Sequence, residues 1–240
     1  MEILKAEKVT KKFGDLVALD AVDVSLGKGD ILGMIGPNGS GKTTMFNVVS
    51  GVYRPVSGEV YFKDERISGR NPYYICRKGI ARTFQIAQPF SQMTLLENVL
   101  VGAMWGGGIS LSKGRDRAEE ILQFVGLGDT MNLVPDEVTT EDRRRLELAR
   151  ALATEPEILL LDEMMAGLTP TEIEQALALL REINKRGITI FMVEHIMRAV
   201  MSICNRIIVL NYGKVIAEGF PKDVVKNEEV IKAYLGERYV

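Results

Sequence analysis

The chain has few cysteines and no excess of charge of either sign. Cys76 and Cys204 are too few for a disulfide framework and are not spaced as metal ligands, so both fit a reducing compartment. The formal net charge of −2 gives no electrostatic reason to expect nucleic acid or an anionic lipid surface as the main partner. Because Glu2 and Lys5 interrupt the start and no run of about 18 apolar residues follows, we expect neither a signal peptide nor a membrane span.

The most informative stretch runs from Gly36 to Thr43 and comprises Gly36, Pro37, Asn38, Gly39, Ser40, Gly41, Lys42 and Thr43. It fits the phosphate-loop pattern G-x-x-x-x-G-K-[ST] at every fixed position. In such a loop the backbone N–H groups surround the β-phosphate, Lys42 reaches the β- and γ-phosphates, and the Thr43 hydroxyl holds Mg²⁺. A strand over 30–35 and a helix from 43 to 50 would place the phosphates at a helix N-terminus. The stretch predicts a nucleoside triphosphate site.

Hydrophobic patterning predicts an α/β fold. Alternation in the first thirty residues favours antiparallel strands with a turn near Gly14 and Asp15, and a short strand is expected at 58–62. Continuous apolar runs at 158–161 and 188–193 are typical of buried parallel strands, with a helix at 170–185 between them. A hairpin is expected around Asn211, Tyr212 and Gly213.

The middle of the chain differs, because it has almost no strand signal. Helices are expected at 115–125 and 140–153, and the stretch 98–112 is interpreted as a helix end followed by a flexible turn. With 240 residues, 46% of them hydrophobic, the chain can bury a sizeable core. We predict one domain, with a nucleotide-binding α/β core of mainly parallel sheet plus an antiparallel β subdomain (1–86 and 156–240) and an inserted helical subdomain (87–155).

Four further residues are candidates for the site. Asp162 and Glu163 end an apolar strand, where the first acid can hold Mg²⁺ through water and the second can polarise the attacking water; the alternative is a solvated acidic turn. His195, the single histidine, follows another apolar strand and could donate to the γ-phosphate, although a structural role is the usual one. Gln85 could touch Mg²⁺ or the attacking water at the start of the helical insertion.

Phe13 lies in a turn-like context upstream of the loop. It could stack on the adenine base, and a core aromatic is nearly as good an interpretation. The chain lacks the Asn-Lys-x-Asp guanine motif, so ATP is the expected nucleotide.

The chain resembles the ATPase subunit of an ABC transporter along essentially its whole length. The resemblance is carried by the order and spacing of Phe13, Gly36–Thr43, Gln85, Asp162-Glu163 and His195. The resemblance implies an ATPase that uses ATP and Mg²⁺, with a nucleotide site extending to Thr44, on the cytoplasmic face of the cell membrane. It also implies transmembrane permease subunits and a second ATPase subunit as partners.

Within that family, four segments resemble the branched-chain amino-acid importers: 82–85, 96–99, 144–147 and 233–237. Systems that import urea or extract lipopolysaccharide share parts of the same pattern and stay open as alternatives.

The chain departs from the family at the signature motif, usually Leu-Ser-Gly-Gly-Gln, through which one subunit holds the partner's ATP. Counting back from 148–152 places this motif at 138–142, where Glu141 replaces the second glycine and Asp142 the glutamine. Met164 replaces a proline after the catalytic glutamate, and Thr169 replaces the usual Asp or Asn of the D-loop. All these positions face the partner subunit in the family.

Glu141 adds a side chain and a negative charge where the γ-phosphate would approach, and 139–142 is a good helix N-cap sequence. The hypothesis is a subunit with a complete phosphate-loop half-site and a poor signature half-site, working in a heterodimer. Two alternatives stay open. Glu141 could turn away and slow the site only modestly, or the chain could be a regulatory subunit that binds ATP with little hydrolysis.

Overall fold

A long antiparallel ribbon opens the chain. In the computed structural model, which describes residues 1–84 and 88–235, β1 (Glu2–Phe13) pairs with β2 (Leu16–Gly27), so the predicted turn at 14–15 is confirmed. β4 (Ser57–Phe62) pairs with the other side of β1, and the short β5 (Glu65–Arg66) completes the order β2-β1-β4-β5. The strands bury apolar residues such as Leu4, Val9 and Leu19, and register shifts between β1 and β2 interrupt the strict alternation of buried and exposed positions.

The chain divides into two compact units, residues 1–72 with 165–240 and residues 73–164. In the first unit, β3 (Ile31–Ile35) runs parallel to both β8 (Thr189–Val193) and β9 (Arg206–Asn211). β10 (Lys214–Gly219) closes the predicted hairpin antiparallel to β9. Every residue of β3 and β8 is buried, which explains their unbroken apolar sequences.

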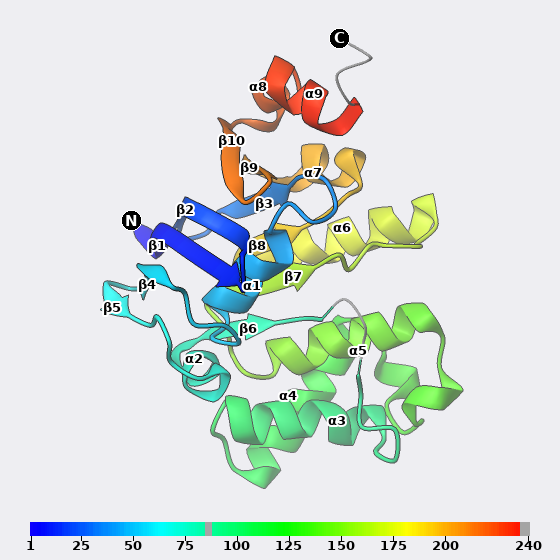
Figure 1. Ribbon diagram of the computed structural model, residues 1–240. Coiled ribbons are helices and arrows are strands. Elements are labelled where there is room, and N and C mark those ends of the chain that lie inside the picture. Colours follow the sequence, from blue (N-terminus) through cyan, green and yellow to red (C-terminus); the bar gives the residue numbers. More distant parts are fainter. Residues whose placement is uncertain (85–87, 236–240) are drawn as a thin grey trace. The chain divides into compact units, whose positions relative to one another are not determined.

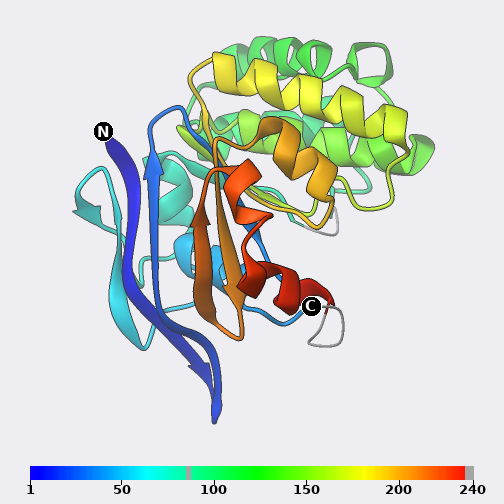
Figure 2. The same ribbon diagram turned by 90° about the horizontal axis from the view of Figure 1, so that it is seen from above.

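Helices complete the first unit (Figure 1): α1 (Lys42–Val49), α6 (Pro170–Lys185), α7 (Met197–Ile203), α8 (Pro221–Val224) and α9 (Glu228–Leu235). α6 has the predicted bounds, because Thr169 and Glu172 form a capping box at its start and Pro170 occupies its first turn. The ring of Phe46 on α1 meets Phe191 on β8 edge-on at 4.8 Å, so the helix is packed against the strand. α9 lies against β10 (Figure 2).

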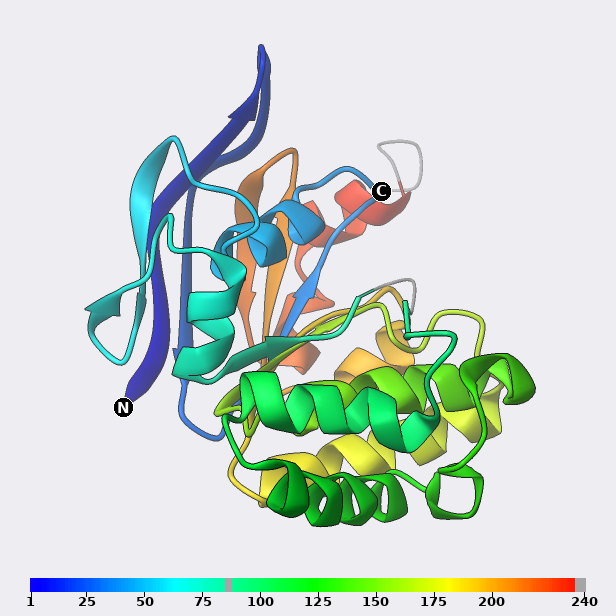
Figure 3. The ribbon, with the colours of Figure 1, turned by 90° about the horizontal axis from the view of Figure 1, so that it is seen from below.

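The second unit pairs β6 (Ile80–Arg82) in parallel with β7 (Ile158–Asp162). Its helices are α2 (Pro72–Lys78), α3 (Leu95–Val101), α4 (Leu111–Phe124) and α5 (Thr140–Leu152). α3, α4 and α5 contact one another, as the green helices of Figure 3 show. Sequence patterning missed β6, because a three-residue strand is too short for a periodic signal. The α/β fold with an antiparallel sheet and an inserted helical part is the one predicted.

The helix end expected within 98–112 lies beyond the end of α3, because Gly102–Gly106 continues as a π-helix and the chain leaves the helix only at 107–110. The reason lies in α5 and its end: a Cβ on Gly102 would stand 2.6 Å from the Arg150 carbonyl oxygen, and one on Gly106 would collide with Thr154. The glycines therefore let this helical turn pass close to a neighbouring backbone. Among the described residues, no helix has the length and apolar character to cross a bilayer.

A buried amide organises the approach to α3. Asn98 is fully buried, and its Nδ2 donates to the carbonyls of Phe90 (3.0 Å), Met93 (3.1 Å) and Thr94 (3.0 Å). Its Oδ1 accepts the Phe90 N–H at 2.8 Å. One side chain thus makes four hydrogen bonds to the backbone of the loop that precedes α3.

Replacing Asn98 by Ala should lower the free energy of unfolding by about 3 kcal/mol, because a fully buried side chain and its four hydrogen bonds to the loop backbone are lost. Urea titration followed by circular dichroism measures the change. Asn132→Ala, at an exposed position of the same unit, is the control and should change stability by less than about 0.5 kcal/mol. Equal stability of the two variants would contradict this account.

Candidate nucleotide-binding and hydrolysis site

The predicted phosphate loop links β3 to α1, and Gly41 forms the N-cap of α1 with φ 110°. A Cβ on Gly41 would lie 2.5 Å from the carbonyl oxygen of Ala18 on β2, and a Cβ on Gly36 would collide with the Leu210 carbonyl on β9. The sequence argument assigned these glycines to phosphate access. The structure adds a second reason, since neighbouring strands press on the back of the loop.

Lys42 is buried inside the loop. Its Nζ donates to the carbonyls of Gly36 (2.8 Å) and Pro37 (2.9 Å). The ammonium group therefore stabilises the curved backbone of the loop through these hydrogen bonds. Its positive charge stays among the loop residues, and the N–H groups at the start of α1 also favour an anion there.

The turn of the β9–β10 hairpin fixes the loop from outside. The Gly213 N–H donates to the Ser40 carbonyl at 2.9 Å, and the Gly213 carbonyl accepts the Asp20 N–H at 2.8 Å. Tyr212, next to it, has φ 44° and a side chain that is 86% exposed. The turn thus joins the phosphate loop to β2.

A pocket of about 310 Å³ opens beside the loop. Phe13, at the end of β1, shares this pocket with loop residues 39–44, with 16–18 at the start of β2, and with Tyr212. The Phe13 ring packs edge-on against Tyr53 at 5.2 Å, and the Lys11 ammonium lies 5.1 Å from its centre. The structure therefore brings Phe13 to the phosphate loop. Sequence reasoning missed Tyr212, because its only signal was an Asn-Tyr-Gly turn.

Asp162 ends β7 and is buried against Arg82 at the end of β6. The Arg82 Nη2 lies 2.8 Å from Asp162 Oδ2, and both side chains are less than 10% exposed. The Asp162 N–H points to the Thr83 hydroxyl at 3.4 Å. The guanidinium compensates the charge of a carboxylate that would otherwise be costly to bury, and it fixes the orientation of that carboxylate.

Glu163 follows with φ 49°, a left-handed conformation that is uncommon for a residue with a Cβ. Such strain concentrates at functional positions, where the surrounding structure holds it in place.

A third acid, Glu194, was missed by the sequence argument. It directly follows β8, is 1% exposed, and accepts the Met165 N–H at 3.0 Å. His195 comes next and is exposed. The sequence signal that could have identified Glu194 was its place between an apolar strand and the single histidine. The buried Glu194 contact fixes the backbone from which His195 projects.

The predicted residues fall into both units. The phosphate loop, Phe13 and His195 lie in the first, whereas Asp162 and Glu163 lie in the second. Gln85 lies outside the described residues.

The residues that flank 85–87 contact α5. Arg150 donates to the Gln88 carbonyl at 3.0 Å, and its guanidinium lies 5.0 Å from the Phe90 ring centre. Burial raises the pKa of the Glu147 carboxyl to about 7, and a hydrogen bond from the Phe84 backbone limits the rise. Helix α5 therefore holds a residue on each side of 85–87.

The signature-equivalent segment at the start of α5 is occupied by its own side chains. Thr139 Oγ1 accepts the Asp142 N–H at 3.1 Å, and the Asp142 carboxylate accepts the Thr139 N–H at 3.3 Å, as the N-cap prediction requires. Glu141 forms an ion pair with Arg145, one turn further along the helix. Its charge is directed away from the helix end, so repulsion is a weaker effect here than the sequence suggested.

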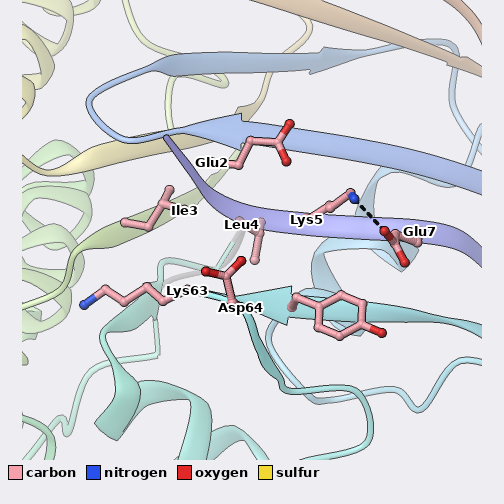
Figure 4. Close-up of a pocket in the computed structure, with 8 residues that line it drawn as sticks. Glu2, Ile3, Leu4, Lys5, Glu7, Lys63 and Asp64 are labelled. Atoms are coloured by element: carbon pink, nitrogen blue, oxygen red, sulfur yellow. Dashed lines mark ion pairs between the residues drawn. The ribbon is translucent and has the colours of Figure 1, made fainter.

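A second hollow, of about 290 Å³, lies over β1 and the β4–β5 turn (Figure 4). Its charges alternate in sign among Glu2, Lys5, Glu7, Lys63 and Asp64, and the Lys5 ammonium lies 2.6 Å from the Glu7 carboxylate. It presents no glycine-rich backbone to a phosphate. The pocket beside the phosphate loop is the better candidate for the nucleotide.

A phosphate loop between a buried parallel strand and a helix defines the chain as a nucleotide-binding ATPase of the P-loop class. Comparison with known proteins gives the family. The sequence profile described as ABC transporter matches residues 19–166, and one described as Branched-chain amino acid ATP-binding cassette transporter matches 214–240. The chain belongs to the ABC transporter ATP-binding family.

Relatives match over nearly the whole length. The chain is 38% identical to the high-affinity branched-chain amino acid transport ATP-binding protein LivG of Escherichia coli K12, over 98% of both chains. A crystal structure of the ADP conformation of an ATP-binding cassette of an ABC transporter is 34% identical, with a TM-score of 0.90 over 99% of this chain and 100% of that one. A dimeric post-hydrolysis cassette bound to ADP and Pi is 30% identical, with a TM-score of 0.82 over 91% and 98% of the two chains.

The raised pKa of Glu147 predicts a pH-dependent stability. The native carboxyl keeps its proton up to about pH 7, whereas the same group in the unfolded chain releases it near 4.5. The native state therefore binds more protons between these values, and stability falls as the pH rises through the window. Relative to the native chain, Glu147→Gln should gain on the order of 2 kcal/mol between pH 4.5 and 7.5.

Urea titrations at several pH values measure this gain. Glu120→Gln, at an exposed carboxyl of the same unit, is the control and should follow the native pH profile. A Glu147→Gln profile parallel to the native one would contradict the assignment.

Proposed function

We propose that the chain is the energy-coupling ATPase of a branched-chain amino-acid importer, bound to transmembrane permease subunits on the cytoplasmic face of the membrane. One observation carries the proposal: the likeness to a branched-chain amino acid transport ATP-binding protein runs end to end, with the C-terminal profile match at 214–240. The pocket beside the phosphate loop supports it.

In this proposal each part of the nucleotide meets a different element. Phe13 contacts the adenine, and the N–H groups of residues 39–44, which line the pocket, surround the phosphates. Lys42 exchanges one carbonyl partner for a phosphate oxygen, so the triphosphate gains a charge-assisted hydrogen bond.

Mg²⁺ would be held by the Thr43 hydroxyl, Gln85 and, through water, Asp162. The donor set fits a hard cation, because it consists of hydroxyl, amide and carboxylate oxygens. Among the described residues no group of three or more His, Cys, Asp or Glu side chains could hold a metal; this suits an ion that keeps waters and phosphate oxygens as ligands. Bound there, the ion would neutralise charge on the phosphates.

Hydrolysis would depend on Glu163 and His195. Glu163 would accept a proton from the attacking water, and its left-handed backbone would fix the direction of the carboxylate. His195 would donate to the γ-phosphate from the backbone that the buried Glu194 anchors. Phosphate release would then reopen the dimer, and the motion would pass through the helical part to the permease.

Glu163→Gln should lower kcat at least about 100-fold and leave the Kd for ATP nearly unchanged, because the amide cannot take the proton. Phosphate release assays and equilibrium binding measure the two effects. Glu228→Gln, at an exposed carboxyl at the start of α9, should hydrolyse ATP like the native chain. Native turnover by Glu163→Gln would overturn the assigned role.

We further propose that the second ATPase subunit is a different chain. Here two N–H groups at the start of α5, those of Thr139 and Asp142, bond within a capping box, and residue 141 carries a side chain where the family has glycine. Loss of backbone contact, rather than charge repulsion, would make this signature weak for a partner's ATP. A heterodimer would then have one hydrolytic site and one site that mostly holds ATP.

Restoring the motif with Glu141→Gly and Asp142→Gln should raise the ATPase activity of the purified chain at least about tenfold, because γ-phosphate contacts return. Activity across protein concentration is the measurement, since dimers make it rise more than linearly. Arg144→Gln is the control for a change of charge on the same helix. An unchanged rate would show that Glu141 is harmless, and tight binding without turnover in the restored variant would favour a regulatory subunit.

A further inference from the structure

The pocket beside the phosphate loop has an exposed apolar rim. Phe13 is 43% exposed, Leu16 67%, Val17 37% and Tyr212 86%, and all four line this pocket. Large apolar side chains gathered at one rim indicate a surface that a ligand covers. Because the loop backbone serves the phosphates, the rim is suited to the nucleoside.

Tyr212 differs from the other rim residues, since it comes from the opposite end of the sequence. Its backbone is fixed although its ring is exposed. The adjoining Gly213 bonds to Ser40 in the phosphate loop and to Asp20 on β2, and a Cβ on Gly213 would lie 2.9 Å from the Ala18 carbonyl. The ring therefore projects from a turn that is held against the first half of β2.

The conformation of Tyr212 is also uncommon. Its φ of 44° is left-handed, where Asn or Gly is favoured over an aromatic residue. If stability alone decided the residue at this turn, Asn or Gly would be expected at position 212. The aromatic ring therefore calls for a separate explanation. Stacking on a base provides one, because every base has a π-face and the contact covers ring area that water now contacts.

We infer that Tyr212 is a second aromatic contact for the nucleoside of ATP, complementing Phe13 from the β9–β10 turn. The inference rests on the proposed function, in which this pocket holds ATP. Tyr212 also borders a separate hollow of about 560 Å³, which is lined by the outside of the phosphate loop and by Glu229 and Lys232 of α9. If the ring served that hollow alone, nucleoside affinity would not depend on it.

Isothermal titration of ATP and of inorganic triphosphate tests the inference. Tyr212→Asn removes the ring and suits the left-handed backbone, so it should fold; Tyr212→Phe keeps the ring. Tyr212→Asn should raise the Kd for ATP about tenfold and leave that for triphosphate unchanged, whereas Tyr212→Phe should bind ATP like the native chain. Tyr73→Asn, at an exposed tyrosine on α2, is the matched control and should have no effect.

Two results would overturn the inference. One is native ATP affinity in Tyr212→Asn; the other is equal weakening of ATP and triphosphate, which would mean a disturbed loop. The Lys42→Met variant distinguishes a failure of the Tyr212 inference from a failure of the proposed function. If Lys42→Met binds ATP like the native chain, the pocket is not the ATP site; if it loses ATP and Tyr212→Asn does not, only the role of Tyr212 fails.

Discussion

The phosphate loop and the pocket beside it depend on close packing at one carbonyl group, that of Ala18 on β2. Gly41 of the phosphate loop and Gly213 of the β9–β10 turn both approach it too closely for a side chain. Gly213 then bonds to Ser40 and Asp20, so three separate segments meet at one point. The loop keeps its shape because rigid neighbours surround it, and the cost of arranging N–H groups around an anion is met during folding.

Buried charges in both units follow the same rule: each has a partner that also fixes its direction. Lys42 is held by loop carbonyls, Asp162 by Arg82, and Glu194 by the Met165 N–H. Leaving any of these groups without its partner would cost several kcal/mol, so the partners are as necessary as the charged groups themselves. This arrangement holds the reactive groups in place before a ligand arrives.

Helix α5 connects two features that the sequence places apart. Its first turn carries the altered signature, and its later turns hold the residues on both sides of 85–87 through Glu147 and Arg150. The Glu141–Arg145 ion pair changes the explanation of the altered signature, because it directs the negative charge away from the helix end. What remains is a helix start at which the capping box occupies the N–H groups of Thr139 and Asp142 and residue 141 carries a side chain.

Local structure follows from the sequence. The phosphate loop, the apolar runs of β3, β7 and β8, and the helix at 170–185 depend on neighbouring residues, and all formed where the pattern predicted. Which distant groups meet depends on the packing of these elements. Arg82 and Asp162 are 80 positions apart, and Tyr212 reaches the Phe13 pocket through a turn that looked ordinary. Periodicity reports which face of an element is buried, whereas such pairs depend on how the elements pack, and no local pattern encodes that.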